Sequence, residues 1–244
     1  MTGKTIVTGA ASGIGLAWAR RLMPEGLAVI AVDLPGPRLD ALVAEGFQTI
    51  GADLSSAADR DRVVEAGENA RALVNSAGII RLKPILDFTV NDIRDIYAVN
   101  VDAVWDLTSR IGRTMSAGGS IVNISSSAAK LSSTTEAAVY ASSKAAVLSI
   151  TRSFAYAFSK SQVRVNAICP GLVDTPMQDE VLAKAAAARG ITAKELSELR
   201  TASVPLGRTT TPEECANLIW FLISDQSAYM TGQALNFTGG MIMH

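Results

Sequence analysis

The sequence predicts an α/β fold, in which one doubly wound parallel sheet is covered by helices on both faces. Two observations lead to this prediction. Short runs rich in β-branched residues alternate along the chain with amphipathic segments of helical length. Most of these short runs are continuously apolar, as is typical of strands that are buried on both faces. Because no linker rich in Pro, Ser or Gly divides the 244 residues, we expect a single domain over 1–244.

The apolar pattern places each expected element in order. Strands are expected at 4–8, 27–33, 47–53, 71–76, 120–125, 162–168 and 233–238, and helices near 14–23, 57–69, 90–116, 138–159 and 212–222. The last helix has the clearest start. Thr211 can cap it, Pro212 suits its first turn, and Glu213 and Glu214 favour the positive end of the helix dipole.

The segment 172–208 breaks this alternation, because it is long and contains no strand pattern. Two helices are expected within them, at 181–189 and 193–200. An insertion of this length is often an active-site lid, so we expect it to shape the substrate pocket. Met177 and Leu182 suggest an apolar wall, and Gln178 and Asp179 could meet substrate hydroxyls.

Composition excludes several classes of protein. The net charge of −1 argues against a nucleic-acid partner. The only histidine is the last residue, His244, which disfavours a Ser-His-Asp hydrolase and a common zinc site, so no metal is expected. Neither a secretory signal nor a membrane span is evident. Cys169 and Cys215 suggest buried reduced thiols, so a soluble cytoplasmic protein is expected.

A glycine-rich turn follows the first strand. In the run Thr8-Gly9-Ala10-Ala11-Ser12-Gly13-Ile14-Gly15, glycines allow the backbone to turn tightly and to approach a pyrophosphate closely. The N–H groups at the start of the next helix then stabilise the phosphate charge. The spacing G-x-x-x-G-x-G differs from the commoner G-x-G-x-x-G fingerprint, and tight packing alone is the alternative interpretation.

The second strand ends in an acid, Asp33, placed 20 residues after Gly13. A carboxylate at this distance can accept a hydrogen bond from the 2′-hydroxyl of an adenosine ribose, and it repels a 2′-phosphate. Ser12 and Leu34 provide no cation, and the Pro-Gly-Pro run before Arg38 can carry that arginine away. The sequence therefore favours NAD over NADP. A solvated acid at a strand end is the alternative.

The third strand also ends in an acid, Asp53, which is followed by Leu54. The Asp53 carboxylate could accept a hydrogen bond from an adenine amino group. It could equally cap the helix that follows. The two roles are compatible, so both stay open from the sequence alone.

A second constellation points to proton transfer. Tyr140 and Lys144 lie four residues apart near the start of a helix and therefore share one face. A cation beside a phenol favours the phenolate, so we expect Lys144 to lower the pKa of Tyr140 from about 10 towards the working pH. Upstream, a strand ends in the hydroxyls of Ser125, Ser126 and Ser127, which could hold a substrate oxygen.

These motifs together resemble the classical short-chain dehydrogenase/reductase family along essentially the whole chain. Each match is weak alone, but their order and spacing are specific. The matching residues are Thr8-Gly9-x-x-x-Gly13-x-Gly15, Asp53-Leu54, Asn75-Ser76-Ala77-Gly78, Asn100, the serine of Asn123-Ile124-Ser125-Ser126, Tyr140-x-x-x-Lys144, and Pro170-Gly171 with Thr175. The departures are Ser76 in place of a second asparagine, a short stretch between Asp53 and Asn75, and Thr238 where the family often has aspartate.

The resemblance implies a Rossmann-like sheet of about seven strands and a catalytic tetrad. By position its members are Asn100, Ser126, Tyr140 and Lys144, with Ser127 as the main rival for the serine. It implies that Asn100 lies in a break of the long helix and holds a water. It also implies cofactor contacts along the strand ends, from Asn75, Ala77, Gly78, Pro170, Gly171, Val173 and Thr175, with Thr175 at the nicotinamide.

The expected activity is NAD-dependent interconversion of a secondary alcohol and a carbonyl. The segment 79–84 resembles that of sugar and polyol dehydrogenases, so a sugar, a polyol or a small hydroxy compound is the expected substrate. One alternative is a 3-oxoacyl thioester reductase that uses NADPH, and another is a non-catalytic nucleotide sensor on the same fold. Relatives suggest a homotetramer or homodimer, in which the tail 241–243 is either a subunit contact or packed on its own domain.

Overall fold

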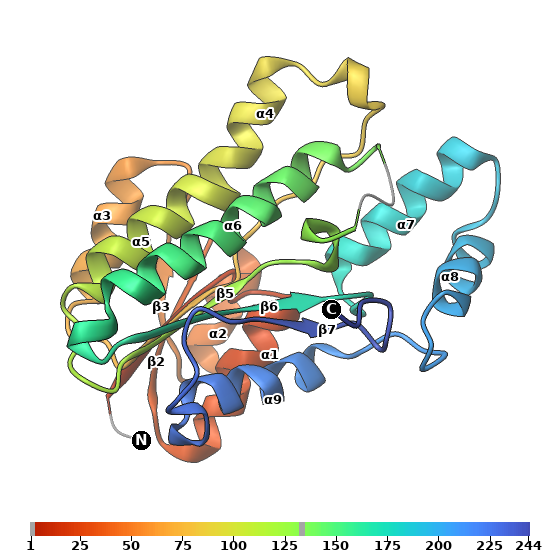
Figure 1. The fold of residues 1–244 in the computed structure, drawn as a ribbon. Coiled ribbons are helices and arrows are strands. Elements are labelled where there is room, and N and C mark those ends of the chain that lie inside the picture. Colours follow the sequence, from red (N-terminus) through yellow and green to blue (C-terminus); the bar gives the residue numbers. More distant parts are fainter. Residues whose placement is uncertain (1–2, 132–134) are drawn as a thin grey trace.

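The computed structural model describes residues 3–131 and 135–244, and within them seven parallel strands form one sheet (Figure 1). The strands lie in the order β3-β2-β1-β4-β5-β6-β7. Their bounds are β1 Lys4–Thr8, β2 Ala28–Asp33, β3 Gln48–Gly51, β4 Ala72–Asn75, β5 Ser120–Ile124, β6 Arg164–Pro170 and β7 Ala234–Phe237. The prediction of a doubly wound parallel sheet is therefore confirmed. The strand order reverses beside β1, between β1 and β4, and such a point opens a crevice at the carboxyl ends of the strands.

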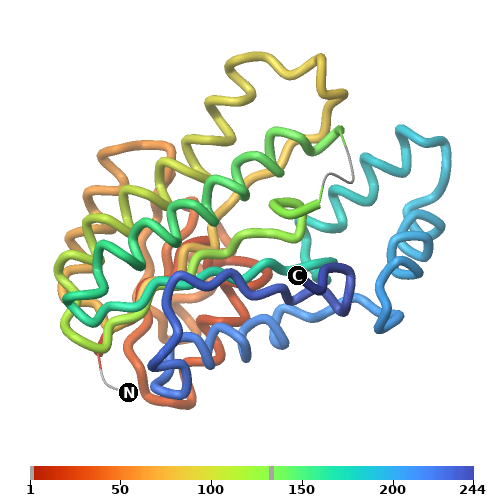
Figure 2. The backbone as a smooth tube through the Cα atoms, in the orientation of Figure 1, coloured from red at the N-terminus to blue at the C-terminus, as the bar shows by residue number. Residues whose placement is uncertain are grey.

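Helices cover both faces of the sheet. One apolar core lies under α1 (Gly13–Leu22), α2 (Pro37–Ala44) and α9 (Pro212–Ile223), and it includes the tilted pair Trp18 and Trp220. The other lies under α3 (Ala57–Ala66), α5 (Ala103–Gly112) and α6 (Ala138–Ala157). The remaining helices are α4 (Val90–Tyr97), which precedes α5, and α7 (Pro176–Arg189) and α8 (Ala193–Ala202), which lie beyond the carboxyl end of the sheet (Figure 2).

Two helices differ from the sequence prediction. The pattern gave no helix between the second and third strands, but α2 forms there, because Pro37 suits a first turn and Leu39 and Leu42 are buried beneath it. The helix expected at 90–116 is not continuous. A π-helical turn, Ala98–Asp102, joins α4 to α5 and carries Asn100, so the break that the resemblance implied is present.

The insertion 172–208 holds two helices, as expected, but α7 begins at Pro176 rather than at residue 181. Thr175 caps it by accepting a hydrogen bond from the N–H of Gln178, and Pro176 occupies the first turn. The expected cap of α9 is confirmed, since Thr211 and Glu214 form a reciprocal capping box.

The two cysteines are free and buried. In the tail, Ile242 is buried against its own chain, whereas Met243 is exposed. No helix among the described residues is both long and apolar enough to cross a bilayer. The same residues contain no group of three or more His, Cys, Asp or Glu side chains placed to hold a metal ion.

A buried arginine holds the end of α9 against the sheet. Arg164, at the start of β6, donates hydrogen bonds to the carbonyl oxygens of Leu222 at 2.7 Å, Ile223 at 3.1 Å and Ser224 at 3.2 Å. These are carbonyls that a helix C-terminus leaves without partners. Burial lowers the pKa of Arg164, so the guanidinium gives up part of its hydration to make these bonds.

We expect Arg164→Met to lower the free energy of unfolding by about 3 kcal/mol, because several buried carbonyl groups lose charged donors at once. Urea denaturation followed by circular dichroism measures this change. The matched control is Arg113→Met, at an exposed arginine after α5, which we expect to change stability by less than ~0.5 kcal/mol. A loss below ~1 kcal/mol for Arg164→Met would show that the guanidinium does not hold this helix end.

Candidate active site

A cavity of about 870 Å³ lies at the carboxyl ends of the strands. Its lining residues come from the turn after β1, the ends of β2 to β6, the start of α6 and the insertion helices α7 and α8. Most of the site residues expected from the sequence line it: Gly9, Ser12, Gly13, Ile14, Asp33, Leu34, Asp53, Leu54, Ala77, Gly78, Ser126, Tyr140, Lys144, Pro170, Gly171, Val173 and Thr175. The fold therefore brings both expected constellations to one cavity.

The glycine-rich turn is shaped for close backbone approach. Gly9 has a φ of +67°, and a Cβ there would lie 2.8 Å from the backbone nitrogen of Ala77. Gly13 has a φ of +53°, and a Cβ there would lie 3.2 Å from Cγ2 of Thr175. Gly15 does not line the cavity, but a Cβ there would overlap the carbonyl oxygen of Gly9. The turn and the start of α1 thus form a narrow cradle without side chains, which fits a pyrophosphate.

Asp33 is fixed at the end of β2. Its carboxylate accepts hydrogen bonds from the backbone N–H of Ala11 at 2.8 Å and of Leu34 at 2.7 Å. Arg38, in the first turn of α2, is exposed and does not line the cavity. The end of the cavity around Asp33 and Asp53 therefore contains two carboxylates and no lysine or arginine among its described lining residues.

Asp53 does not cap α3. The capping residue is Ser56, whose hydroxyl accepts a hydrogen bond from the N–H of Asp59. Asp53 instead accepts hydrogen bonds from the backbone N–H of Ser55 at 2.9 Å and from its hydroxyl at 2.7 Å. Of the two roles left open by the sequence, capping is wrong. The Asp53 side chain belongs to the cavity wall and is held in a local turn.

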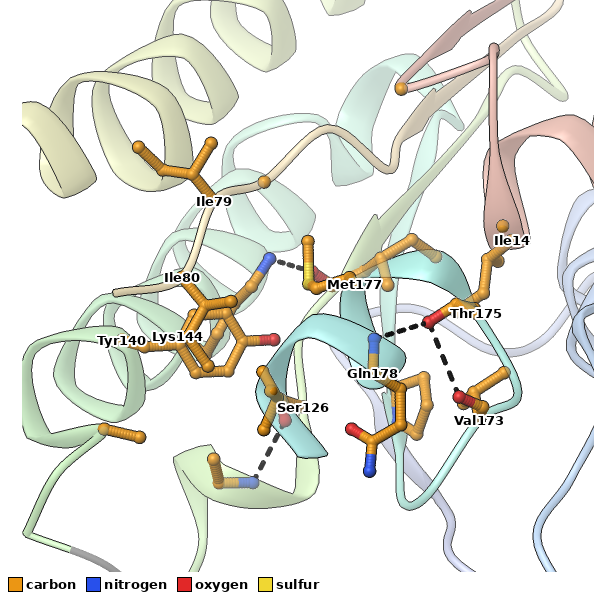
Figure 3. Close-up of a pocket in the computed structure, with 18 of the residues that line it drawn as sticks. Ile14, Ile79, Ile80, Ser126, Tyr140, Lys144, Val173, Thr175, Met177 and Gln178 are labelled. Atoms are coloured by element: carbon orange, nitrogen blue, oxygen red, sulfur yellow. Dashed lines mark hydrogen bonds between the residues drawn. The ribbon is translucent and has the colours of Figure 1, made fainter. Parts of the chain in front are cut away.

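Tyr140, Lys144 and Ser126 face one another across the cavity wall (Figure 3). The first two come from the first turns of α6, where Nζ of Lys144 lies 5.7 Å from the centre of the Tyr140 ring. Lys144 is 3% exposed, and its ammonium donates a hydrogen bond to the carbonyl oxygen of Ile124 at 2.8 Å. Ser126 follows β5, and its hydroxyl accepts a hydrogen bond from the N–H of Ala128 at 3.1 Å.

Burial governs the ionisation of this pair. It lowers the pKa of Lys144 to about 8, because the ammonium leaves water. It also raises the pKa of Tyr140, opposite to the direction expected from the sequence, and a hydrogen bond with Ser126 opposes that rise. The physical reason is that desolvation of the buried phenol outweighs the hydrogen bond with Ser126.

The three serines at the end of β5 have different surroundings. Ser125 is buried, and its hydroxyl donates a hydrogen bond to the backbone carbonyl of Lys144 at 2.8 Å. Ser126 and Ser127 both line the cavity, but only Ser126 contributes to the ionisation of Tyr140. These contacts favour Ser126 over its neighbours as the hydroxyl that faces the phenol.

Two expected asparagines lie behind the cavity wall. Asn100 is fully buried, and its amide exchanges hydrogen bonds with both backbone groups of Ile79 at 2.8 and 3.0 Å. Asn75 donates to Asn123 at 2.8 Å and to Thr108 at 3.0 Å, so it ties β4 to β5 and α5. A Cβ at Gly78 would lie 3.3 Å from Oδ1 of Asn100 and 3.2 Å from Nζ of Lys144, which shows how closely these groups converge.

The insertion supplies lining residues that the sequence did not single out. They are Pro176, Val181, Ala185, Arg189, Leu196, Arg200 and Ser203, and Glu136 joins them from the segment before α6. Met177 and Gln178 line the cavity as expected. Asp179 is exposed and Leu182 packs with Ala186 and Leu196, so neither of these two lines it. Helical spacing from Gln178 would have found Val181 and Ala185, but no local pattern marks Arg200, which reaches the cavity from a different helix.

Comparison with known proteins agrees with this geometry. A family model described as enoyl-(acyl carrier protein) reductase matches residues 9–242. The 3-oxoacyl-[acyl-carrier-protein] reductase FabG of Thermotoga maritima is 35% identical, over 98% of this chain and 97% of that protein. Galactitol 2-dehydrogenase of Agrobacterium fabrum is 34% identical, over 96% of this chain and 95% of that protein.

Solved structures give the same answer for the fold. A short chain dehydrogenase family protein from Francisella tularensis superposes with a TM-score of 0.90 at 30% identity, covering 99% of both chains. Actinorhodin polyketide ketoreductase, solved with NADPH, gives 0.89 at 32% identity, covering 98% of this chain and 97% of that one. The chain belongs to the short-chain dehydrogenase/reductase family and is an oxidoreductase that acts on CH–OH and carbonyl groups with a small-molecule substrate and NAD or NADP.

Proposed function

We propose that this protein uses NAD to interconvert a secondary alcohol and a carbonyl in the cavity at the carboxyl ends of β1 to β6. One observation carries the proposal. The phenol of Tyr140, the ammonium of Lys144 and the hydroxyl of Ser126 line the same cavity as the glycine cradle after β1. A group that transfers protons therefore faces the place where a dinucleotide fits.

We propose a place for each part of the dinucleotide. Gly9, Gly13 and the start of α1 would hold the pyrophosphate, and Asp33 the adenosine ribose. Asp53 and Leu54 would line the adenine, while Val173 and Thr175 would lie at the nicotinamide. When bound, the nicotinamide ring supplies the hydride acceptor in alcohol oxidation and the hydride donor in carbonyl reduction.

The chain itself moves and stabilises the proton. In alcohol oxidation the Tyr140 phenolate takes the proton of the substrate hydroxyl, and in reduction the neutral phenol returns it to the carbonyl oxygen. Ser126 holds that oxygen and favours the phenolate through its hydrogen bond. Lys144, kept in place by the carbonyl of Ile124, places positive charge beside the phenol ring. Asn100 holds the backbone of Ile79 near Lys144. In the proposed proton path, the proton leaves Tyr140 by way of Lys144 and a water held at Asn100.

The charge around Asp33 favours NAD over NADP. Both oxygens of its carboxylate accept backbone hydrogen bonds, so the side chain is fixed where a 2′-phosphate would need a cation. The described lining residues at this end include no lysine or arginine to pair with such a phosphate. Two negative groups at contact distance repel each other by several kcal/mol at the low effective dielectric of such a site.

We propose a sugar, a polyol or a related small hydroxy compound as the substrate. The segment 79–84 supports this choice by its resemblance to sugar and polyol dehydrogenases, and galactitol 2-dehydrogenase is one of the relatives. The second candidate is reduction of a 3-oxoacyl thioester with NADPH. The 3-oxoacyl reductase of Thermotoga maritima and the actinorhodin ketoreductase solved with NADPH support it. Turnover of a polyol panel with NAD, compared with turnover of an acetoacetyl thioester with NADPH, separates the two.

A homotetramer or homodimer in the cytoplasm is also proposed. Exposed aromatic side chains on the long helices support assembly, with Trp105 on α5 at 53% exposure and Tyr156 on α6 at 87%. Met243 in the tail is 80% exposed. The two free buried cysteines are compatible with a reducing compartment.

Tyr140→Phe should abolish turnover and leave NADH binding nearly unchanged, because it removes the proton-transferring hydroxyl and keeps the ring. We expect kcat to fall by about 10³-fold or more. Stopped-flow kinetics and NADH fluorescence titration measure the two quantities. Tyr229→Phe, at a fully exposed tyrosine outside the cavity, is the control. Turnover within threefold of wild type in Tyr140→Phe would exclude the assignment.

Ser126→Ala should lower kcat by about 10²-fold and move the alkaline rise of alcohol oxidation to higher pH. The direction follows because the Ser126 hydrogen bond lowers the pKa of Tyr140, so its loss raises that pKa and delays formation of the phenolate. A pH–rate profile measures the shift. Ser127→Ala should leave the profile in place, and a larger effect from that variant would transfer the role to Ser127.

Asp33→Asn should raise kcat/KM for NADP relative to NAD by about thirtyfold, because it removes a charge that repels the 2′-phosphate. Initial rates with both dinucleotides give this ratio. Asp40→Asn, at an exposed acid in α2 outside the cavity, is the control. If wild type already prefers NADP, or if the ratio does not change in Asp33→Asn, the proposed preference is wrong.

A further inference from the structure

Arg200 of α8 lines the substrate side of the cavity and has no acidic partner. It is half-buried, and no carboxylate among the described residues lies within 4 Å of its guanidinium. Its partner is the amide of Gln178. When that amide is turned so that its oxygen faces the guanidinium, the oxygen accepts hydrogen bonds from Arg200 at 2.9 and 3.3 Å. The half-buried guanidinium of Arg200 is therefore stabilised by hydrogen bonds to one neutral amide and by no carboxylate among the described residues.

The other arginines in the cavity wall are paired. Arg189 forms an ion pair with Glu136 at 3.0 Å, and this pair ties the end of α7 to the segment before α6. Arg81 forms ion pairs with Asp92 at 3.0 Å and Asp95 at 2.8 Å. Arg200 thus differs from Arg81 and Arg189, because it forms no ion pair with the described residues.

The surroundings of Arg200 make an anion favourable there. Burial lowers its pKa, and the nearby positive charge of Arg189 lowers it further. A cation that is partly removed from water and placed beside another cation gains strongly from a negative partner. A guanidinium presents two parallel N–H donors, a geometry that matches the two oxygens of a carboxylate.

Arg200 is linked through Gln178 to the part of the cavity that contains Thr175, Tyr140 and Ser126. Gln178 lies in the first turn of α7, where its N–H bonds to the Thr175 hydroxyl at 3.3 Å, and Thr175 faces Gly13 of the cradle. Met177 and Gln178 lie on the same turn of α7 and face the space in front of Tyr140 and Ser126 (Figure 3). A ligand that bonds Arg200 through one end therefore lies in the same space as these side chains.

We propose that, among the small hydroxy compounds considered above, the substrate is a hydroxy acid or the corresponding oxo acid, whose carboxylate binds Arg200. The proposal rests on the function proposed above and names the class of substrate for that site. Gln178 would orient the free guanidinium and the apolar side chains Met177 and Val181 would enclose the carbon chain. The carbinol or carbonyl carbon would then lie near Tyr140.

Binding to the protein–NADH complex tests the charge requirement without turnover. The probes are two matched pairs, 3-hydroxybutyrate with 3-hydroxybutyramide and gluconate with glucitol, measured by isothermal titration calorimetry. We expect the acid of at least one pair to bind about thirtyfold more tightly than its neutral partner, the effect of one charge-assisted bidentate contact. Equal affinities within both pairs would overturn the proposal.

Variants assign that preference to one side chain. Arg200→Gln should remove the preference for the acid, and Arg200→Lys should restore only part of it, because lysine keeps the charge and loses the paired donors. Arg113→Gln, at an exposed arginine outside the cavity, should keep the wild-type preference. NADH binding and circular dichroism show that each variant is folded. A preference for the acid that survives in Arg200→Gln would overturn the proposal.

The same measurements separate this inference from the proposed function. Acid binding that depends on Arg200, without oxidation by NAD of either acid or of any member of the polyol panel, would contradict the proposed activity and keep the anion site. Rapid oxidation of glucitol with no effect of Arg200→Gln would keep the activity and overturn the anion site. The two statements can therefore fail independently.

Discussion

The chemistry of this site depends on one constraint, the burial of a phenol and an ammonium one helical turn apart. Burial raises the pKa of Tyr140 and lowers that of Lys144, so each ionised form is costly inside the pocket. The protein limits that cost with fixed dipoles, because the ammonium donates to the carbonyl of Ile124 and Ser126 meets the phenol. The charges that proton transfer needs are thus stabilised by groups that are already in place before substrate binds.

Residues behind the cavity wall help to hold Tyr140, Lys144 and Ser126 in place. Asn100 can reach Ile79 only because the helix between α4 and α5 widens into a π-helical turn at Ala98–Asp102. Gly78 lacks a side chain where Lys144 and Asn100 converge. Asn75 joins β4 to β5, the strand that precedes Ser126. Asn75 and Asn100 do not line the cavity, yet their hydrogen bonds hold the segments that do.

Local patterns in the sequence were sufficient for the sheet and for the two constellations at its carboxyl edge. The strands are continuous apolar runs, and the glycine turn and the Tyr140–Lys144 spacing are short-range signals. What failed depends on tertiary contacts. α2 was not predicted, because the Pro-Gly-Pro run at its start is typical of a loop. The direction of the Tyr140 pKa shift follows from burial. Arg200 reaches the cavity only because α8 packs beside α7. Residue spacing along the chain reveals neither burial nor which helices pack side by side.

The division of charge within the cavity explains why family membership leaves the substrate open. Asp33 and Asp53 line the cavity at the ends of β2 and β3, whereas Arg189 and Arg200 line it from α7 and α8, so the proposed cofactor and substrate would meet different electric fields. An acyl-carrier-protein reductase and a galactitol dehydrogenase are nearly equally similar to this chain, at 35% and 34% identity. We propose that a few side chains of the insertion select the substrate. Among them Arg200 gives the strongest physical signal, because a half-buried guanidinium whose partner is a neutral amide gains from a negative group on the ligand.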